Sequence, residues 1–260
     1  MPTITAPFSK GQATCCPNKD VAGTSEVAWV KILNANTFPA LLPRLAAHEG
    51  RMILSASRRR ADNKMLDTEG FILAGGLSSR MGEDKSRLRL GGQTFVEIAA
   101  SALATVSSRV CIVGSRPGVE SHGLPVVSDI YEGLGALGGL HAALAACEAP
   151  WVAVVSCDLP FVTRELFERL ASLRGDDVDA VAPVQDDGRP QPLCALYAAA
   201  RCREAADALI RAGELRPRTL LQKVRTRWVQ FQELSDLDGS DLFFNNVNTP
   251  ADYEEAKRRC

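Results

Sequence analysis

The chain has 260 residues, of which 46% are hydrophobic and 23% are charged, and its formal net charge is −1. This length and composition are typical of one sizeable α/β domain or two small ones. A nearly neutral chain has no overall basic field to attract nucleic acid or acidic lipid, so we expect small-molecule partners, with no nucleic acid and no membrane among them.

The first part of the chain shows no sustained helical or strand period. It is rich in Pro, Gly, Thr and Ser, as in TITAPFSKGQATCCPNKDVAGTSE, and only FPALLPRLAAHEG suggests a short helix. We therefore expect residues 1–66 to be an N-terminal extension that is partly disordered, and residues 67–260 to form the functional domain.

Beyond residue 66, short apolar runs alternate with segments of helical period. Seven strands are predicted, at residues 70–74, 109–113, 124–128, 151–156, 179–184, 193–198 and 226–231. Five helices are predicted, at residues 94–106, 138–147, 163–173, 201–212 and 250–259. Runs such as WVAVVS are apolar without alternation, as expected of strands covered by helices on both faces. The pattern predicts an α/β fold with a Rossmann-like, doubly wound, mostly parallel sheet, whose ligands bind beyond the carboxyl ends of its strands.

The loop after the first predicted strand, LAGGLSSRMGEDK, has the composition of a phosphate-binding loop. Gly75 and Gly76 allow a tight turn in which backbone amides approach an anion. Ser78 adds a hydroxyl donor, while Arg80 and Lys85 add positive charge. A glycine turn beside a solvated charged loop would explain any one of these features, but not the whole string. The loop is not a Walker A motif, because Glu-Asp follows its last glycine in place of Lys-Ser or Lys-Thr.

A second glycine-rich turn, GLGALG at residues 133–138, fits the pattern GxGxxG. Asp158 follows this turn by 20 residues, which matches the spacing of the dinucleotide fingerprint. That fingerprint places its glycines directly after a strand, whereas a segment beginning with Asp129 intervenes here. An NAD(P)-dependent oxidoreductase is therefore only a remote alternative.

The segment WVAVVSCDLPFV predicts a buried strand that presents Asp158 at its carboxyl end. A carboxylate in that place can hold Mg²⁺, which prefers one or two acidic ligands together with substrate phosphates. The alternative is that Asp158 caps the following helix. Thr163, just before RELFERL, already supplies such a cap, so the metal role is favoured.

Two asparagines, Asn246 and Asn248, lie close to a Thr-Pro helix start in FFNNVNTPADYEEA. They could brace or cap this loop, or they could place a second amide near the phosphates or the metal. The three histidines, His48, His122 and His141, have no metal-ligand spacing, and we interpret them as incidental.

Four of these motifs together resemble the molybdenum cofactor guanylyltransferases, the MobA family. They are LAGGxSxRMGxDK at residues 73–85, the Asp129 loop ending in a Gly-Gly pair, CDLP at residues 157–160, and NxNTP at residues 246–250. The resemblance covers roughly residues 69–259. It implies a Rossmann-like fold of the nucleotide-diphosphosugar transferase type. It also implies transfer of GMP from GTP to the phosphate of molybdenum-molybdopterin, forming molybdopterin guanine dinucleotide and releasing pyrophosphate.

The same resemblance implies roles for individual residues. The nucleotide is assigned to Leu73, Ala74, Gly75, Gly76, Ser78, Lys85, Asp129 and Asp158. Catalytic roles fall to Lys85, Asp158 and Arg80, with Asp158 as the ligand of Mg²⁺. Support of the substrate or its phosphates is assigned to Gly138, Gly139, Asn246 and Asn248. GTP and molybdenum-molybdopterin are the implied partners, the latter delivered by other proteins of cofactor biosynthesis.

Two further alternatives stay open. A molybdopterin cytidylyltransferase or another sugar or cofactor nucleotidyltransferase would share the fold, but such relatives resemble LAAG where this chain has LAGG, so Gly75 favours GTP. A non-catalytic nucleotide-binding regulator would bind GTP without turnover.

The sequence also indicates a cellular compartment. Its longest apolar runs fall far short of the roughly 20 residues that a membrane span requires, and residues 1–30 lack the pattern of a secretory signal. The eight cysteines are scattered without a CxxC pair, and several lie inside apolar runs as small buried hydrophobic residues. A reduced, cytoplasmic protein is expected.

Overall fold

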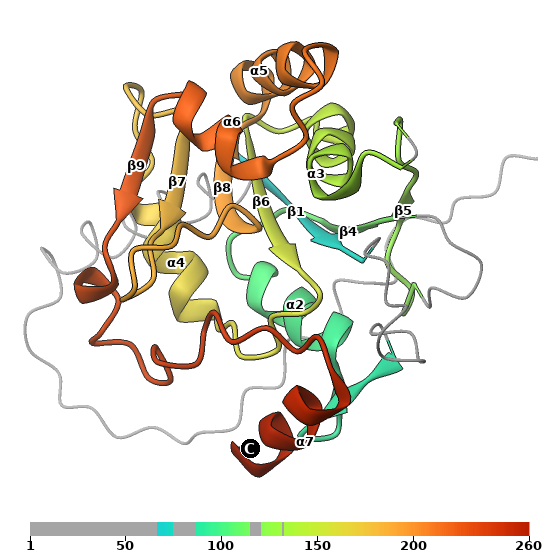
Figure 1. The fold of residues 1–260 in the computed structure, drawn as a ribbon, viewed down its shortest axis with the longest axis vertical. Helices are drawn as coiled ribbons and strands as arrows, with labels where there is room; N and C mark the ends of the chain where they lie inside the picture. Colours follow the sequence, from blue (N-terminus) through green and yellow to red (C-terminus); the bar gives the residue numbers. More distant parts are fainter. Residues whose placement is uncertain (1–66, 75–86, 115–120, 132, 260) are drawn as a thin grey trace, which may run out of the picture. The chain divides into compact units, whose positions relative to one another are not determined.

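Figure 1 shows the fold in a computed structural model, which describes residues 67–74, 87–114, 121–131 and 133–259. All of these residues belong to one compact unit. The predicted extension, residues 1–66, and most of the predicted phosphate loop, residues 75–86, lie outside the described residues.

The main sheet has seven strands in the order β5-β4-β1-β6-β8-β7-β9. In chain order these strands are β1 (Thr68–Leu73), β4 (Val110–Val113), β5 (Val126–Val127), β6 (Trp151–Ser156), β7 (Ala180–Pro183), β8 (Cys194–Ala198) and β9 (Thr226–Val229). Every neighbouring pair is parallel except the two pairs that contain β8, which runs antiparallel to both β6 and β7. The prediction of a mostly parallel sheet is confirmed.

The register at the centre of the sheet aligns the carboxyl ends of three strands. Leu73 pairs with Val113 on β4 and with Ser156 on β6, so these strands end at the same level. Backbone hydrogen bonds continue the alignment past the strand ends: the Ala74 amide donates to the Val113 carbonyl at 2.9 Å, and the Cys157 amide donates to the Leu73 carbonyl at 3.1 Å. The loops that follow β1 and β6 therefore leave the sheet side by side.

Helices cover both faces of the sheet. The helices are α2 (Phe95–Leu103), α3 (Gly135–Ala146), α4 (Arg164–Ser172), α5 (Ala199–Arg211), α6 (Pro217–Lys223) and α7 (Pro250–Arg259). Helices α2 and α4 pack together on one face, and α3, α5 and α6 pack on the other (Figure 1).

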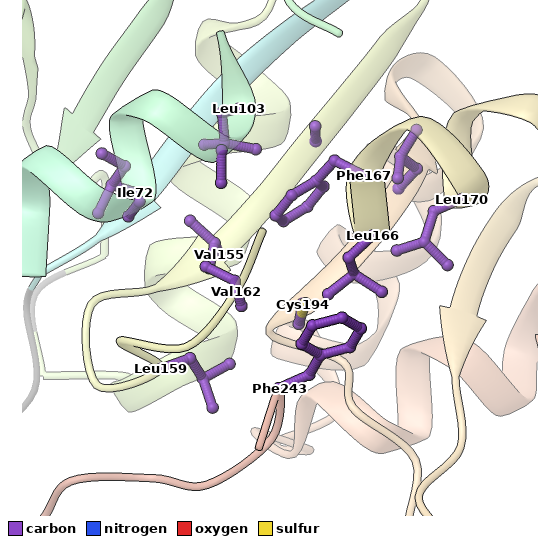
Figure 2. Close-up of a cluster of buried hydrophobic side chains, with 14 of the residues drawn as sticks. Ile72, Leu103, Val155, Leu159, Val162, Leu166, Phe167, Leu170, Cys194 and Phe243 are labelled. Atoms are coloured by element: carbon purple, nitrogen blue, oxygen red, sulfur yellow. The ribbon is translucent and has the colours of Figure 1, made fainter. Parts of the chain in front are cut away.

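Alternate residues of β1 belong to two separate apolar clusters, one on each face of the sheet. Ile72 points to the face of α2 and α4, where it lies in a cluster with Leu103 and Phe167 (Figure 2). Phe71 and Leu73 point to the opposite face, against α3. Burial on both faces removes the polar alternation of a half-exposed strand, which explains the uninterrupted apolar runs in the sequence.

Cysteines take part in this core as predicted. Cys111, Cys157, Cys194 and Cys202 are buried as free thiols. Burial raises the pKa of the Cys202 thiol to about 12, so it stays protonated and packs as a small hydrophobic group.

Several short elements were not predicted. A two-stranded hairpin, β2 (Arg89–Leu90) with β3 (Gln93–Thr94), turns through Gly91 and Gly92, whose φ angles of 56° and 86° suit glycine. Helix α6 and the 3₁₀ helix η2 (Phe231–Glu233) were also missed. Each has at most seven residues, too few to show a helical period in the sequence. Among the described residues no helix has the length and hydropathy to cross a membrane.

Candidate functional site

The site lies at the edge of the sheet where β1 and β6 end. Leu73 and Ala74 are buried there, and Asp158 is half-buried two residues beyond the end of β6. The turn after β6 is fixed by a hydrogen bond from the Leu159 amide to the Ser156 carbonyl at 3.2 Å. Thr163 caps α4 through a bond from the Leu166 amide to its hydroxyl at 3.3 Å, as predicted, so Asp158 is not used as that cap.

A segment near the C-terminus brings Asn246 to Asp158. The Asn246 Nδ2 donates to Asp158 Oδ2 at 3.3 Å, and the amide of Val247 donates to the Asp158 carbonyl at 2.9 Å. Val247 is buried, which holds the segment against the turn after β6. The structure thus joins two sequence-predicted site residues that are 88 positions apart.

Asn248 has a different place from Asn246. Its amide and that of Thr249 donate to the Asp252 carboxylate at 2.9 and 2.8 Å, while the Asp252 amide donates to the Thr249 hydroxyl at 3.2 Å. These reciprocal bonds form a capping box at the start of α7. The Asn246 side chain thus contacts the Asp158 carboxylate, and the backbone of Asn248 belongs to the helix cap.

The loop that carries Asp129 packs against the start of α3. A methyl group added at Gly139 would lie 3.9 Å from Asp129 Oδ1 and 3.9 Å from a Leu73 methyl group. A methyl group at Gly138 would lie only 3.2 Å from the Tyr131 carbonyl oxygen. The missing side chain at Gly138 thus lets the backbone at Tyr131 approach α3, while Gly139 has ordinary space beside Asp129 and Leu73. The N-terminal dipole of α3 favours an anion at the same edge.

Five predicted residues, Gly75, Gly76, Ser78, Arg80 and Lys85, lie outside the described residues. The residues on either side of that segment are described: Ala74 directly follows β1, and the hairpin β2–β3 begins at Arg89. The predictions for this loop stay predictions.

A cavity of about 620 Å³ is lined in part by Asn246, the residue that bonds to Asp158. Its other lining residues include Gln185, Gln191, Arg189 and Phe161. Arg189 forms an ion pair with Asp187 at 2.5 Å in the tight turn between β7 and β8. Amide side chains offer both donors and acceptors, so this wall suits a polar ring system with hydrogen-bonding edges.

The described residues hold no group of three or more His, Cys, Asp and Glu side chains placed for a metal. Asp158 with the Asn246 amide beside it offers one carboxylate and one amide at a strand end. Mg²⁺ is often bound in this way, because it keeps several waters and takes its remaining ligands from substrate phosphates. The donor set therefore fits Mg²⁺ shared with a bound nucleotide, and does not form a closed protein cage.

Two residues near the site were missed by sequence reasoning. His141, interpreted as incidental, is buried in α3, with its Nε2 2.8 Å from Asp207 on α5 and its ring 5.1 Å from the ring of Tyr131. Tyr253 on α7 bonds to the backbone of Arg89. The partner of each lies far away in the sequence, so only the burial of His141 could have been predicted, from the apolar period of α3.

Comparisons with known proteins find relatives that match most of this chain. The family described as the MobA-like NTP transferase domain matches residues 70–228. A probable molybdenum cofactor guanylyltransferase of Pelotomaculum thermopropionicum is 36% identical over 197 residues, covering 74% of this chain and 93% of that protein. Another, from Geobacillus, is 32% identical over 200 residues and covers 74% and 98%.

Solved structures show the same likeness. The molybdopterin-guanine dinucleotide biosynthesis protein A of Archaeoglobus fulgidus matches with a TM-score of 0.61 and 25% identity, covering 74% of this chain and 98% of that one. The 2-C-methyl-D-erythritol 4-phosphate cytidylyltransferase of Thermus thermophilus shares the fold, with a TM-score of 0.54, 22% identity, and 74% and 97% covered.

Proposed function

The chain belongs to the MobA-like NTP transferase family, and from that membership we propose that it is a molybdenum cofactor guanylyltransferase. The proposed reaction transfers GMP from GTP to the terminal phosphate of molybdenum-molybdopterin, yields molybdopterin guanine dinucleotide and releases pyrophosphate. One observation carries the proposal: Leu73, Asp129 and the Asp158–Asn246 pair, which sequence motifs place far apart, converge at one edge of the sheet.

The chemistry requires charge neutralisation and alignment, without a protein nucleophile. An oxygen of the acceptor phosphate attacks the α-phosphorus of GTP in line with the bond to the β-phosphate. The new P–O bond forms as the bond to the bridging oxygen breaks, and the electron pair leaves with pyrophosphate. The attacking phosphate is already ionised, so no general base is needed.

Each site residue of this chain would have its own role in the reaction. Backbone amides around Gly75 and Gly76, together with Arg80 and Lys85, would neutralise the triphosphate. Asp158 would bind Mg²⁺, which when bound supplies positive charge to the phosphate oxygens. Asn246 would hold the Asp158 carboxylate in one orientation through the bond to Oδ2. Asp129, close to Leu73 and Gly139, would contact the nucleotide.

The acceptor substrate would lie in the cavity beside Asn246. This cavity is lined by Asn246, whose side chain bonds to Asp158, so a ligand bound there could present its phosphate to the nucleotide. The side-chain amides of Gln185 and Gln191 suit the donor and acceptor edges of a pterin ring. We propose that other proteins of cofactor biosynthesis deliver this acceptor.

Selectivity for the base of the nucleotide tests the proposal most directly. We expect GTP to be preferred over CTP by at least about 100-fold in kcat/KM, because hydrogen bonds to guanine would be left unpaired by cytosine. The experiment supplies the full chain with molybdopterin-loaded acceptor, Mg²⁺ and each of the four nucleoside triphosphates, and measures the dinucleotide product. Gly75→Ala, which changes LAGG to LAAG, should weaken the preference for GTP over CTP.

Each outcome decides between candidate functions. Equal or better use of CTP would replace the guanylyl assignment with a cytidylyltransferase of the same fold. Binding of GTP without any product would indicate a nucleotide-binding regulator. An unchanged preference in Gly75→Ala would show that the selectivity comes from other residues.

A further inference from the structure

The hydroxyl of Tyr253 forms a two-point contact with one residue of the β2–β3 hairpin. The Arg89 amide donates to the Tyr253 hydroxyl oxygen at 3.2 Å, and that hydroxyl donates to the Arg89 carbonyl at 2.8 Å. Tyr253 lies in the first turn of α7, 164 positions from Arg89 in the sequence. The contact therefore ties the C-terminal helix to a hairpin that directly follows the predicted phosphate loop.

Apolar packing surrounds this contact. The Tyr253 ring meets the Phe95 ring edge-on with 6.1 Å between centroids, and the Lys257 ammonium lies 4.1 Å from the Tyr253 ring centroid. Both rings adjoin a small cluster that includes Leu90, Phe95 and Val247. Val247 is thus shared between the packing under α7 and the backbone bond to Asp158. Figure 1 shows α7 beside α2 at this end of the domain.

Val247 and Tyr253 are six positions apart in the sequence, and hydrogen bonds link the residues between them. The capping box of Thr249 and Asp252 fixes the start of α7, and the Tyr253 amide bonds to the Thr249 carbonyl at 3.1 Å. A displacement of α7 would consequently move Val247 and Asn246 together. Both of these residues bond to Asp158.

We propose that Tyr253 is a positioning residue. Its hydroxyl fixes α7 on the β2–β3 hairpin and thereby sets where Asn246 meets the Asp158 carboxylate. Its effect on catalysis rests on the proposed nucleotidyl transfer, whereas its effect on the geometry around Asp158 does not.

The matched variants are Tyr253→Phe and Lys257→Gln in the full chain. Tyr253→Phe keeps the ring and its packing but removes both hydrogen bonds to Arg89. Lys257→Gln removes the cation over the same ring and leaves the hydroxyl in place. We expect Tyr253→Phe to lower kcat/KM for GTP by about 5- to 20-fold, and Lys257→Gln to change it less than about twofold.

A double-mutant cycle with Asn246→Ala tests the route of the effect. If Tyr253 acts by placing Asn246, then Tyr253→Phe should cost little further activity in a chain that already lacks the Asn246 amide. A purely structural loss would multiply with the loss from Asn246→Ala. Full multiplication of the two losses would overturn the proposed route.

Hydrogen exchange of the Val247 amide gives a readout that does not depend on activity. Because this amide bonds to the Asp158 carbonyl, loosening of α7 should speed its exchange by about 5- to 10-fold in Tyr253→Phe and not in Lys257→Gln. Unchanged exchange and unchanged activity in Tyr253→Phe would overturn the inference. Faster exchange in a protein that transfers no GMP from any triphosphate would contradict the proposed function and leave the positioning role standing.

Discussion

Two adjacent glycines of α3, Gly138 and Gly139, meet different surroundings. A methyl group at Gly138 would lie 3.1 Å from the Leu134 Cβ and 3.2 Å from the Tyr131 carbonyl oxygen. At Gly139 its nearest neighbours would be at 3.9 Å, an ordinary contact. Replacing glycine by alanine inside a helix otherwise stabilises it by about 0.5–1 kcal/mol. The close contacts therefore oppose this stabilisation at Gly138 but not at Gly139.

Gly139→Ala should keep or raise the free energy of unfolding, whereas Gly138→Ala should not gain stability. In Gly138→Ala the loop around Tyr131 must move by a few tenths of an ångström, and Asp129 lies two positions earlier in that loop. We therefore expect the KM for GTP to rise by about 5- to 10-fold in this variant. Urea unfolding and steady-state kinetics of both variants make the comparison. A normal KM in Gly138→Ala would show that the loop adapts without displacing Asp129.

Asp158→Asn should reduce turnover by at least about 100-fold while the fold stays intact. The substitution preserves the volume of the side chain but removes the negative charge that would bind Mg²⁺. Activity measured over a range of Mg²⁺ concentrations, together with the thermal unfolding midpoint, separates the two effects. Near-normal activity at saturating Mg²⁺ would remove Asp158 from the metal site.

Among individual residues, the sequence predicts those whose role is marked by a motif in the neighbouring residues. Asp158 follows an apolar run and Asn246 precedes a helix start, so both could be assigned to the site before their contact was known. Tyr253 carries no such local signal, because its role depends on Arg89, a hairpin residue 164 positions away. Burial and hydrogen-bond partners of this kind arise only from the folded chain.

The Asp179 carboxylate links three elements at the edge of the sheet opposite the candidate site. Asp179, just before β7, accepts two hydrogen bonds from the Arg225 guanidinium, at 3.0 and 2.9 Å, and one from the Arg225 amide at 3.1 Å. It also forms an ion pair with Arg201 on α5. Arg225 immediately precedes β9, so the clamp joins the starts of β7 and β9 to α5.

The hydrogen bonds from Arg225 lower the pKa of Asp179 to about 2. Since this pKa is below the value of about 3.9 in an unfolded chain, the clamp stabilises the folded protein fully above about pH 4 and loses its effect as the pH falls towards 2. Both guanidinium groups are more than half exposed, so screening by water reduces the contribution to about 1–2 kcal/mol.

Asp179→Asn tests this contribution. Free energies of unfolding, measured in urea between about pH 2 and pH 5, should rise with pH more steeply in the wild type than in the variant, by about 1–2 kcal/mol over the interval. Other carboxylates titrate equally in both proteins and cancel in the difference. Parallel curves would mean that Asp179 contributes no pH-dependent stability.

Elements with strong local patterns were predicted well, and those defined by pairing were not. Residues 151–156 and 250–259 match β6 and α7 at both ends, because each has a clear apolar run or helix start. The direction of β8 could not be predicted, because a strand buried on both faces has the same composition whether it is parallel or antiparallel. The hairpin β2–β3 was missed since its strands have only two residues each.

For the molecule as a whole, the relatives match only part of the chain. The match to the Pelotomaculum thermopropionicum relative spans 93% of that protein but only 74% of this chain. The family match begins at residue 70, two positions after β1 starts. The division into an extension of residues 1–66 and a functional domain of residues 67–260 stays a prediction, which a shortened chain tests.

A shortened chain of residues 65–260 should therefore fold and keep its activity. The central strand β1 pairs with β4 on one side and β6 on the other, and the described helices cover both of its faces. The amide of Trp151 donates to the Asp67 carbonyl at 3.0 Å, so this starting point retains the first backbone bond described for the domain. A chain that begins at residue 71 would lose three of the six paired positions between β1 and β6 and should not fold.

The comparison needs the full chain and both shortened chains. Circular dichroism, urea unfolding and guanylyl transfer should agree within about twofold in activity and about 1 kcal/mol in unfolding free energy for the full chain and residues 65–260. Loss of folding in residues 65–260 would show that the preceding 64 residues contribute to the stability of the domain. Retained folding with lost activity would instead assign those residues a role in substrate binding, because the central strand and its neighbours would then be intact without them.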